Sequence, residues 1–180
     1  MKNISVDKNI SGDSTKWKNW ISVFAPNTCK LCAEKHGAVY PAYLTAIPDF
    51  PAHPNGLCYI DYMRTKQVGT ASKAGLNGVD AHLMYGRGLL SYYIRKGDAR
   101  SKGWVQAAGN LANVLPGRMI GGDIYGNREG KLPSANNRIW YEADIDYKSG
   151  YRNDSRILYS NDGLIFVTYD HYHTFYEITR

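Results

Sequence analysis

The C-terminal third of the chain contains five short stretches with the composition of β-strands. They are MIGGDIY (119–125), IWYEADI (139–145), RILYS (156–160), LIFVTY (164–169) and TFYEIT (174–179). β-Branched and aromatic residues favour strands, whereas the Gly, Asn, Asp and Ser residues between the stretches favour turns. Consecutive strands joined by short turns pair in the antiparallel sense. The pattern therefore predicts an antiparallel sheet as the framework of this region.

Helical periodicity precedes these strands. Leu76, Val79 and Leu83 recur at helical spacing and predict a helix over 75–87. Shorter helical segments are expected near 96–103 and 109–114. Helices followed by strands indicate the α+β class. We therefore expect residues 75–180 to form one domain in which N-terminal helices pack on one face of a C-terminal antiparallel sheet.

The first 74 residues have little periodicity and divide by composition. Residues 1–20 are polar and are expected to form a loosely ordered start. Residues 21–63 are rich in Cys, His, Pro and aromatic residues, which indicates a small irregular module. Residues 64–74, RTKQVGTASKA, are polar and small and are interpreted as a linker.

A possible metal site lies in the Cys/His-rich module. Cys29, Cys32, His53 and Cys58 form the pattern CKLC…HPNGLC, which offers four ligands of the kind that hold tetrahedral structural zinc. A module with so little periodicity would gain folding energy from a bound metal. His36 is a rival ligand, and the alternative is that the thiols are reduced or redox-active.

The stretch RIWYEADIDYKSGYRNDSRILYS (138–160) combines carboxylates and arginines around a turn. Side chains alternate between the faces of a strand, so Glu142 and Asp144 share one face. Arg152 and Arg156 share a parity too, and a returning strand would bring both near the carboxylates. One interpretation is a set of salt bridges on a solvated sheet, and the other is a site for an anionic substrate.

His171, in the stretch TYDHYHTF, favours the second interpretation. RNA cleavage needs a base for the ribose 2′-OH, an acid for the leaving 5′-oxygen and fixed positive charge for the phosphate. A glutamate with a pKa of about 4.3 can act as the base, and a histidine with a pKa of about 6.5 can act as the acid. Arginine presents a planar fork of donors to phosphate. These roles require no metal ion.

The glycine-containing segment GGDIYGNREGKLP (121–133) is a candidate reader of a base. Glycines allow backbone N–H groups to approach a flat ligand closely. Backbone amides around Asn127 and Arg128 would meet the O6 atom of guanine, and the Glu129 carboxylate would accept hydrogen bonds from N1 and N2. The alternative is a plain hairpin turn.

Residues 75–180 resemble the barnase family of small guanyl-preferring bacterial ribonucleases. The resemblance rests on GVDAHL, YYIRK, KGWVQAAGNLANVLPGRMIGGDIYGNREGKLP, RIWYEADIDYKSGYRNDSRILYS and TYDHYHTFYEI, which occur in this order. It implies that Glu142 is the general base, His171 the general acid, and Lys96, Arg152 and Arg156 the cations around the phosphate. It also implies a guanine site and two supporting carboxylates. The guanine site comprises Tyr125, Gly126, Asn127, Arg128, Glu129 and Tyr172, and the supporting carboxylates are Asp123 and Asp144.

One departure from the family concerns the helix that carries Lys96. Arg95 stands where the family has a hydroxyl that caps this helix. An arginine cannot accept hydrogen bonds from the N-terminal N–H groups, and its charge opposes the helix dipole. We expect a loss of about 1 kcal/mol of local stability.

The resemblance leads to a specific expectation of function. The chain is expected to cleave single-stranded RNA after guanosine, without a catalytic cofactor, through a 2′,3′-cyclic phosphate that is then hydrolysed. The alternatives are a non-cleaving RNA-binding module and a structural protein of phage heads. The second alternative arises because CKLCAEKHGAVY…PDFPAHPNGLC resembles the Cys/His-rich end of phage Mu F-type head-morphogenesis domains, which are sometimes joined to toxin domains.

Charge and hydropathy bear on the partner and the location of the chain. The net charge of +6 and the pI of about 9.1 suit a polyanionic partner such as RNA, although they also suit a protein that is basic for solubility. The sequence has no run of 18 apolar residues, so no membrane span is expected, and its first residues contain no apolar core of a signal peptide. The expectation is therefore a cytosolic protein, a protein exported by a route that this segment does not encode, or the end of a longer chain. We expect the protein to be a monomer and the effector end of a bacterial toxin, secreted or delivered into a target cell. We also expect an acidic inhibitor resembling barstar to bind it.

Overall fold

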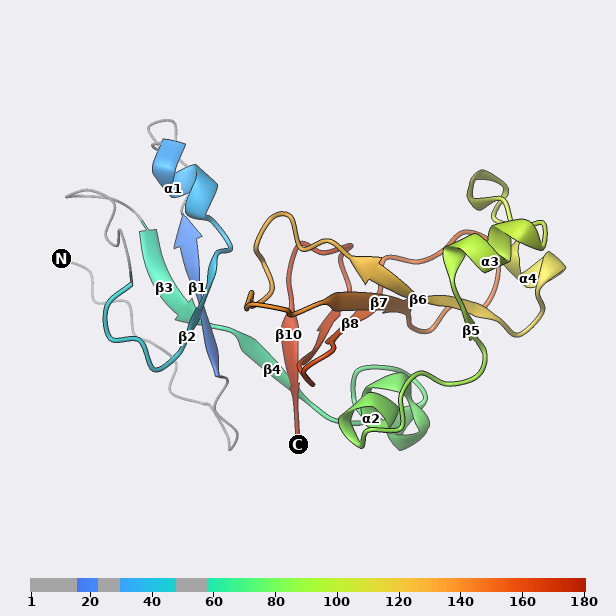
Figure 1. Ribbon diagram of the computed structural model, residues 1–180, viewed down its shortest axis with the longest axis horizontal. Helices are drawn as coiled ribbons and strands as arrows, with labels where there is room; N and C mark the ends of the chain where they lie inside the picture. The colour runs from blue at the N-terminus through green and yellow to red at the C-terminus, as the bar shows by residue number, and fades with distance from the viewer. Residues whose placement is uncertain (1–15, 23–29, 48–57) are drawn as a thin grey trace.

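The computed structural model describes residues 16–22, 30–47 and 58–180. Within them the chain forms two sheets and several short helices (Figure 1). The strands are β1 (Trp17–Ser22), β2 (Val39–Pro41), β3 (Cys58–Tyr62), β4 (Arg64–Gln67), β5 (Tyr93–Ile94), β6 (Met119–Tyr125), β7 (Trp140–Asp144), β8 (Arg156–Ser160), β9 (Ile165–Thr168) and β10 (Tyr176–Thr179). The helices are α1 (Lys30–Lys35), α2 (Val79–Met84), α3 (Lys96–Ser101) and α4 (Leu111–Val114), with 3-10 turns η1 (Gly75–Asn77) and η2 (Gln106–Ala108). No helix among these residues has the length and apolar character to cross a bilayer.

The larger sheet has the strand order β4-β10-β9-β8-β7-β6-β5. The α+β class is confirmed, and each of the five strand stretches of the sequence analysis contains a strand. The expectation of a purely antiparallel sheet is wrong at both edges, because β4 pairs with β10 and β5 pairs with β6 in the parallel sense. These two edge strands come from segments whose composition does not identify them as strands.

The helix predicted over 75–87 is divided into η1 and α2 by Gly78. Gly78 has an extended conformation, with φ −74° and ψ 165°. A Cβ at this position would lie 2.4 Å from the Ser72 hydroxyl and 2.7 Å from the Asp80 Oδ1 atom. The chain therefore turns here at a close approach that only glycine permits.

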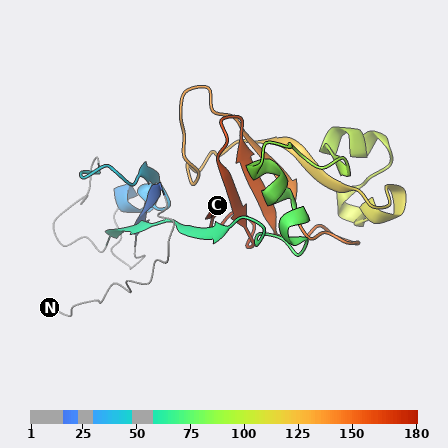
Figure 2. The ribbon, with the colours of Figure 1, turned by 90° about the horizontal axis from the view of Figure 1, so that it is seen from below.

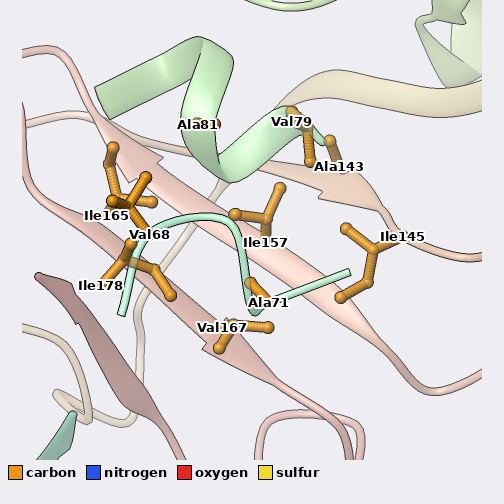
Figure 3. Packing of buried hydrophobic residues seen from close by; sticks show 10 residues of the cluster. All are labelled: Val68, Ala71, Val79, Ala81, Ala143, Ile145, Ile157, Ile165, Val167 and Ile178. Atoms are coloured by element: carbon orange, nitrogen blue, oxygen red, sulfur yellow. The ribbon is translucent and has the colours of Figure 1, made fainter. Parts of the chain in front are cut away.

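One face of the large sheet packs under α2. Figure 3 shows Ala143 of β7 and Ile157 of β8 beside the helix residues Val79 and Ala81, with Ile145, the residue after β7, in the same cluster. The cluster is completed by Val68, Ala71, Ile165, Val167 and Ile178. The alternation predicted for β7 is confirmed, because Ala143 and Ile145 face this core and Glu142 and Asp144 face away from it.

The opposite face of the sheet carries a second apolar cluster beside its polar groups. Trp140, Leu158 and Phe166 alternate with the residues of the first cluster and pack together with Met63, Leu132 and Phe175. Figure 2 shows α2 on one side of the sheet, away from the long loop between β6 and β7. The functional residues therefore lie on the face that α2 does not cover.

The N-terminal part contains a small antiparallel sheet, with the order β2-β1-β3, and helix α1. We call these elements the N-terminal module. Along β1 the side chains are alternately buried and half-buried, and Trp20 is fully buried against Cys32 and Ile47. This regular sheet differs from the irregular module expected, and residues 17–20 of the expected loose start form most of β1. Residues 1–15 lie outside the described residues.

The segment interpreted as a linker, 64–74, is attached to the large sheet. It begins with β4, which pairs with β10, and its Val68 N–H donates to the Thr179 carbonyl at 2.7 Å. The fully buried Asp80 of α2 then accepts hydrogen bonds through Oδ2 from the N–H groups of Gly69 (2.6 Å) and Ala71 (3.3 Å). These bonds fix residues 64–71 against the large sheet and α2.

Candidate active site

The predicted catalytic residues line one cavity of about 400 Å³ on the face of the sheet opposite α2. Its lining includes Glu142, His171, Arg152, Arg156 and Lys96. The wall is completed by Gln106, Tyr125, Tyr151, Asn153, Asp154 and Tyr172. The structure therefore brings together side chains from β7, β8, α3 and the loop before β10.

Glu142 lies at the base of this cavity and is 6% exposed. One carboxylate oxygen is paired with the Lys96 ammonium, and the other accepts a hydrogen bond from the Tyr172 hydroxyl. Burial alone would raise the pKa of Glu142, but these two hydrogen bonds and the positive charges of Lys96 and Arg152 outweigh it and hold the pKa below its ordinary value. A carboxylate has about four acceptor positions, so the ionised group can still accept a proton from a substrate.

Asp144 holds the two arginines. It is fully buried and lies opposite Arg156 in the register of β7 and β8. Arg152 donates to both carboxylate oxygens at 2.8 and 2.6 Å, and Arg156 Nε lies 3.1 Å from Oδ1. Burial would lower the pKa of Arg152, but the hydrogen bond and charge of Asp144 outweigh it and raise this pKa. Asp144 therefore holds both guanidinium groups in fixed positions and keeps Arg152 charged.

Lys96 is positioned by an unexpected cap on α3. Arg95 is the N-cap residue and makes no side-chain capping bond, as the sequence indicates. Instead, the Asp123 carboxylate of β6 accepts a hydrogen bond from the Lys96 backbone N–H at 2.9 Å. Asp123 reaches this position beside a shift in register between β6 and β7, where Gly122 has a φ of +90°. A carboxylate from another element thus replaces the missing capping hydroxyl.

The loop before β10 presents His171. The side chain of His171 is exposed, and both His171 and Tyr172 have positive φ values, +54° and +71°. Such angles are uncommon outside glycine and persist only where neighbouring groups impose them. Asp170 supplies that restraint, because its carboxylate accepts hydrogen bonds from the backbone N–H groups of His173 (3.1 Å) and Thr174 (2.9 Å).

Asp170 is a functional residue that the sequence analysis did not identify as such. Two further donors, the hydroxyls of Thr168 (2.9 Å) and Thr174 (2.7 Å), also bind its carboxylate. Burial would raise the pKa of Asp170, but these donors lower it below its ordinary value. The pattern Asp-x-x-x-Thr, in which a carboxylate caps the following turn, was the available signal.

The candidate guanine site forms a neighbouring cavity of about 430 Å³. The predicted residues Tyr125, Gly126, Asn127, Arg128, Glu129 and Tyr172 all line it, together with Lys131, His171 and His173. The Asn127 side chain closes the loop, since it donates to the Leu132 carbonyl at 2.8 Å and accepts from the Leu132 N–H at 3.0 Å. The loop is therefore fixed before any ligand binds.

Aromatic and charged groups complete this cavity. The rings of Tyr125 and Tyr172 stack at 5.1 Å with an interplanar angle of 23°. The Glu129 carboxylate is exposed and pairs with the Lys131 ammonium at 2.6 Å, and this hydrogen bond lowers the pKa of Glu129. Glu129 is therefore an ionised acceptor at neutral pH, as recognition of guanine N1–H and N2–H requires.

Only half of the expected zinc ligands lie in the described residues. Cys32 and Cys58 belong to one cluster around Trp20, and the Cys58 thiol donates to the Ser22 hydroxyl at 3.5 Å. Cys29 and His53 lie outside the described residues. The rival ligand His36 accepts a hydrogen bond at Nδ1 from the Ser22 N–H at 3.1 Å.

Comparison with known proteins identifies the family of the chain. A family model described as ribonuclease matches residues 84–179. A ribonuclease of Heyndrickxia coagulans is 53% identical over 102 residues, which are 57% of this chain and 94% of that protein. Ribonucleases of Bacillus intermedius and Bacillus pumilus show the same identity over 102 residues, but the match covers only 63% of the length of each. The chain belongs to the barnase-type family of microbial ribonucleases.

Proposed function

We propose that this protein is an endoribonuclease that cleaves single-stranded RNA on the 3′ side of guanosine. The observation that carries the proposal is the shared cavity of Glu142 and His171, with Lys96, Arg152 and Arg156 around it. Family membership supports the general activity. The preference for guanosine and the roles of individual residues are inferences from the geometry.

In the first step, Glu142 accepts the proton of the ribose 2′-OH as the 2′-oxygen attacks the adjacent phosphorus. The bond between phosphorus and the 5′-oxygen breaks, and His171 donates a proton to that oxygen. The products are a 2′,3′-cyclic phosphate and a 5′-OH end. Each of the two proton transfers contributes on the order of 10²–10⁴ in rate.

In the second step, the two residues exchange roles. His171 accepts a proton from water as the water oxygen attacks the phosphorus of the cyclic phosphate. The bond between phosphorus and the 2′-oxygen breaks, and Glu142 returns a proton to that oxygen, which leaves a 3′-phosphate. Lys96 and Arg152 stabilise the negative charge that accumulates on the phosphoryl oxygens in both steps. Arg156 is 3% exposed and also donates to the Asn153 carbonyl at 2.6 Å, so we assign it mainly to the fixed positive field.

Guanosine selection follows from the groups of the neighbouring cavity. The ionised Glu129 accepts from N1–H and N2–H, and backbone N–H groups at Asn127 and Arg128 donate to O6. Adenine has the opposite donor and acceptor at positions 1 and 6, so it would leave these groups unpaired. A site built on such hydrogen bonds discriminates strongly because unpaired polar groups are costly.

The test is a digest of a defined RNA in the presence of EDTA, with the ends mapped. The proposal predicts fragments that end in guanosine 2′,3′-cyclic phosphate, followed by the slower appearance of 3′-phosphate. Intact RNA in a stable complex would instead identify a non-cleaving binding module. Cleavage without base preference would refute the assignment of the guanine site.

We further propose that the protein acts as a toxin, secreted or delivered into a target cell, and is neutralised by an acidic inhibitor resembling barstar. Inhibitor carboxylates would bind near His171 and Arg152, where charge complementarity increases the association rate. Arg152 offers more exposed side chain than Arg156, 11% against 4%. A tight complex whose affinity is unchanged by Arg152→Ala would contradict this geometry.

A structural zinc ion in the N-terminal module remains a separate proposal. Cys32 and Cys58 come from different elements and meet in one cluster, which suits a metal that joins α1 to β3. Zinc bound to the predicted Cys and His ligands would stabilise the fold of the module without entering the reaction. Elemental analysis of the purified protein should find one equivalent of zinc, which is lost in Cys58→Ser.

A further inference from the structure

The small sheet of the N-terminal module has one open face. Trp20, Ile60 and Cys58 belong to the apolar cluster on the other face. The register pairs Asn19 with Asp61 and Ile21 with Tyr59, and these four residues alternate with the buried ones. They therefore lie together on the face that the module's core does not use.

This open face forms one wall of a cavity of about 290 Å³ between the module and the nuclease domain. The nuclease side of the cavity is lined by Lys131 of the candidate guanine loop and by His173, Thr174 and Phe175 of the loop that presents His171. The two walls are close, since a Cβ on Gly37 of the module would lie 3.3 Å from the Lys131 Cγ atom. Figure 1 shows the loop between β6 and β7 on the side of the sheet that faces the module.

The cavity continues the two cavities of the proposed active site. Tyr125, His171 and Tyr172 line both the catalytic cavity and the guanine cavity. Lys131 and His173 line both the guanine cavity and the one at the module. The three cavities therefore lie in sequence along the surface, with the guanine cavity in the middle.

The lining of the third cavity suits a nucleotide. Arg64 provides positive charge for a phosphate beside Lys131, whose ammonium pairs with Glu129, and Tyr59 is 49% exposed and available for a base to stack on. Asp61 is the acidic side chain in this lining and provides a carboxylate for a base edge.

We propose that this cavity is a subsite for the nucleotide on the 5′ side of the guanosine, formed jointly by the N-terminal module and the nuclease domain. This inference rests on the proposed function. The scissile phosphate occupies the catalytic cavity and joins the guanosine to its 3′ neighbour. The RNA strand therefore extends from the guanosine toward the module on its 5′ side. The module thus extends the RNA-binding surface of the nuclease.

The test measures kcat/KM of the full chain for a guanosine-containing dinucleotide. It then measures kcat/KM for the same dinucleotide extended by one or two nucleotides, either at its 5′ end or at its 3′ end. The 5′ extension should raise kcat/KM about tenfold, which corresponds to ~1.4 kcal/mol and agrees with the contribution of one stacked base. Tyr59→Leu should remove this gain, and Tyr59→Phe should retain it because the ring remains. The rate for the dinucleotide should not change in either variant.

Tyr43→Leu is the matched control. Tyr43 belongs to the same part of the chain and is 81% exposed, but it does not line the cavity. Its substitution should leave the gain intact. If the dinucleotide is cleaved but the 5′ extension has no effect, or if only a 3′ extension responds to Tyr59→Leu, the subsite is refuted and the nuclease assignment stands. Failure to cleave the dinucleotide or its extensions would refute both.

Discussion

Asp144→Asn tests whether the buried carboxylate organises the cationic side of the active site. The side chain of Asp144 is inaccessible to solvent and forms three contacts of 2.6 to 3.1 Å with Arg152 and Arg156. Asparagine has nearly the same shape but no charge, and its amide group presents donors to two guanidinium groups that can only donate. The substitution therefore leaves two positive charges in a poorly solvated position.

The expected cost follows from the exposure of these groups. Removal of one partner from a buried ion pair costs ~3–5 kcal/mol. Arg152 and Arg156 retain side-chain exposures of 11% and 4%, so partial solvation relieves part of this cost. We expect a loss of about 3 kcal/mol in the free energy of unfolding. With a urea m-value of about 2 kcal/mol/M, the urea midpoint would fall by about 1.5 M.

Asp162→Asn provides the matched control. Asp162 also accepts hydrogen bonds from an arginine, Arg138, at 2.7 and 2.9 Å, but its side chain is 44% exposed. Surface pairs of this kind contribute ~0.2–1 kcal/mol. Urea unfolding followed by circular dichroism and by tryptophan fluorescence would measure both variants. A cost for Asp144→Asn below about 1 kcal/mol, or no larger than that of Asp162→Asn, would refute the reasoning.

Three further predictions concern single contacts. Asp123→Ala should lower the free energy of unfolding by about 1 kcal/mol because it removes the cap of α3. Adding Arg95→Ser to this variant should restore most of the lost stability, and thermal unfolding that shows no such recovery would contradict the capping role. Tyr172→Phe removes a hydrogen bond that lowers the pKa of Glu142, so the acidic limb of the kcat/KM profile should move to higher pH, and a shift to lower pH would be inconsistent with this bond. Asp80→Ala should increase hydrogen exchange at residues 67–72 with a cost of about 2 kcal/mol, and unchanged exchange there would show that the carboxylate does not anchor this segment.

The alternation along β7 was predictable from the sequence because it depends only on strand geometry. Glu142 and Asp144 share one face regardless of which strands pair with β7. The side chains that pair with Glu142 and Asp144 were harder to predict from the sequence. The pairing of Asp144 with Arg156 depends on the register of β7 and β8, and the position of Lys96 depends on a helix far away in the sequence. Strand parity predicted that the arginines would lie near the carboxylates, whereas the placement of Lys96 at the phosphate came from the resemblance to a known family.

Other features of the fold could be recognised only from the structure and not from the sequence. Strand β4 has the polar sequence RTKQ, and it is a strand because β10 offers an unpaired edge beside it. The contact of Asp123 with α3 depends on the irregular register of β6 near Gly122. The attachment of residues 64–71 depends on the pairing of β4 with β10 and on hydrogen bonds to Asp80. None of these relationships has a local sequence pattern.

The most direct test of the central claim is the pH dependence of kcat/KM for a guanosine dinucleotide in the wild type, Glu142→Gln and His171→Gln. If Glu142 is the base and His171 the acid, the wild type gives a bell-shaped profile. Glu142→Gln then loses the acidic limb, His171→Gln loses the basic limb, and each variant loses at least about 10²-fold in rate. Cleavage at near wild-type rate by either variant, with both limbs preserved, would contradict the assignment.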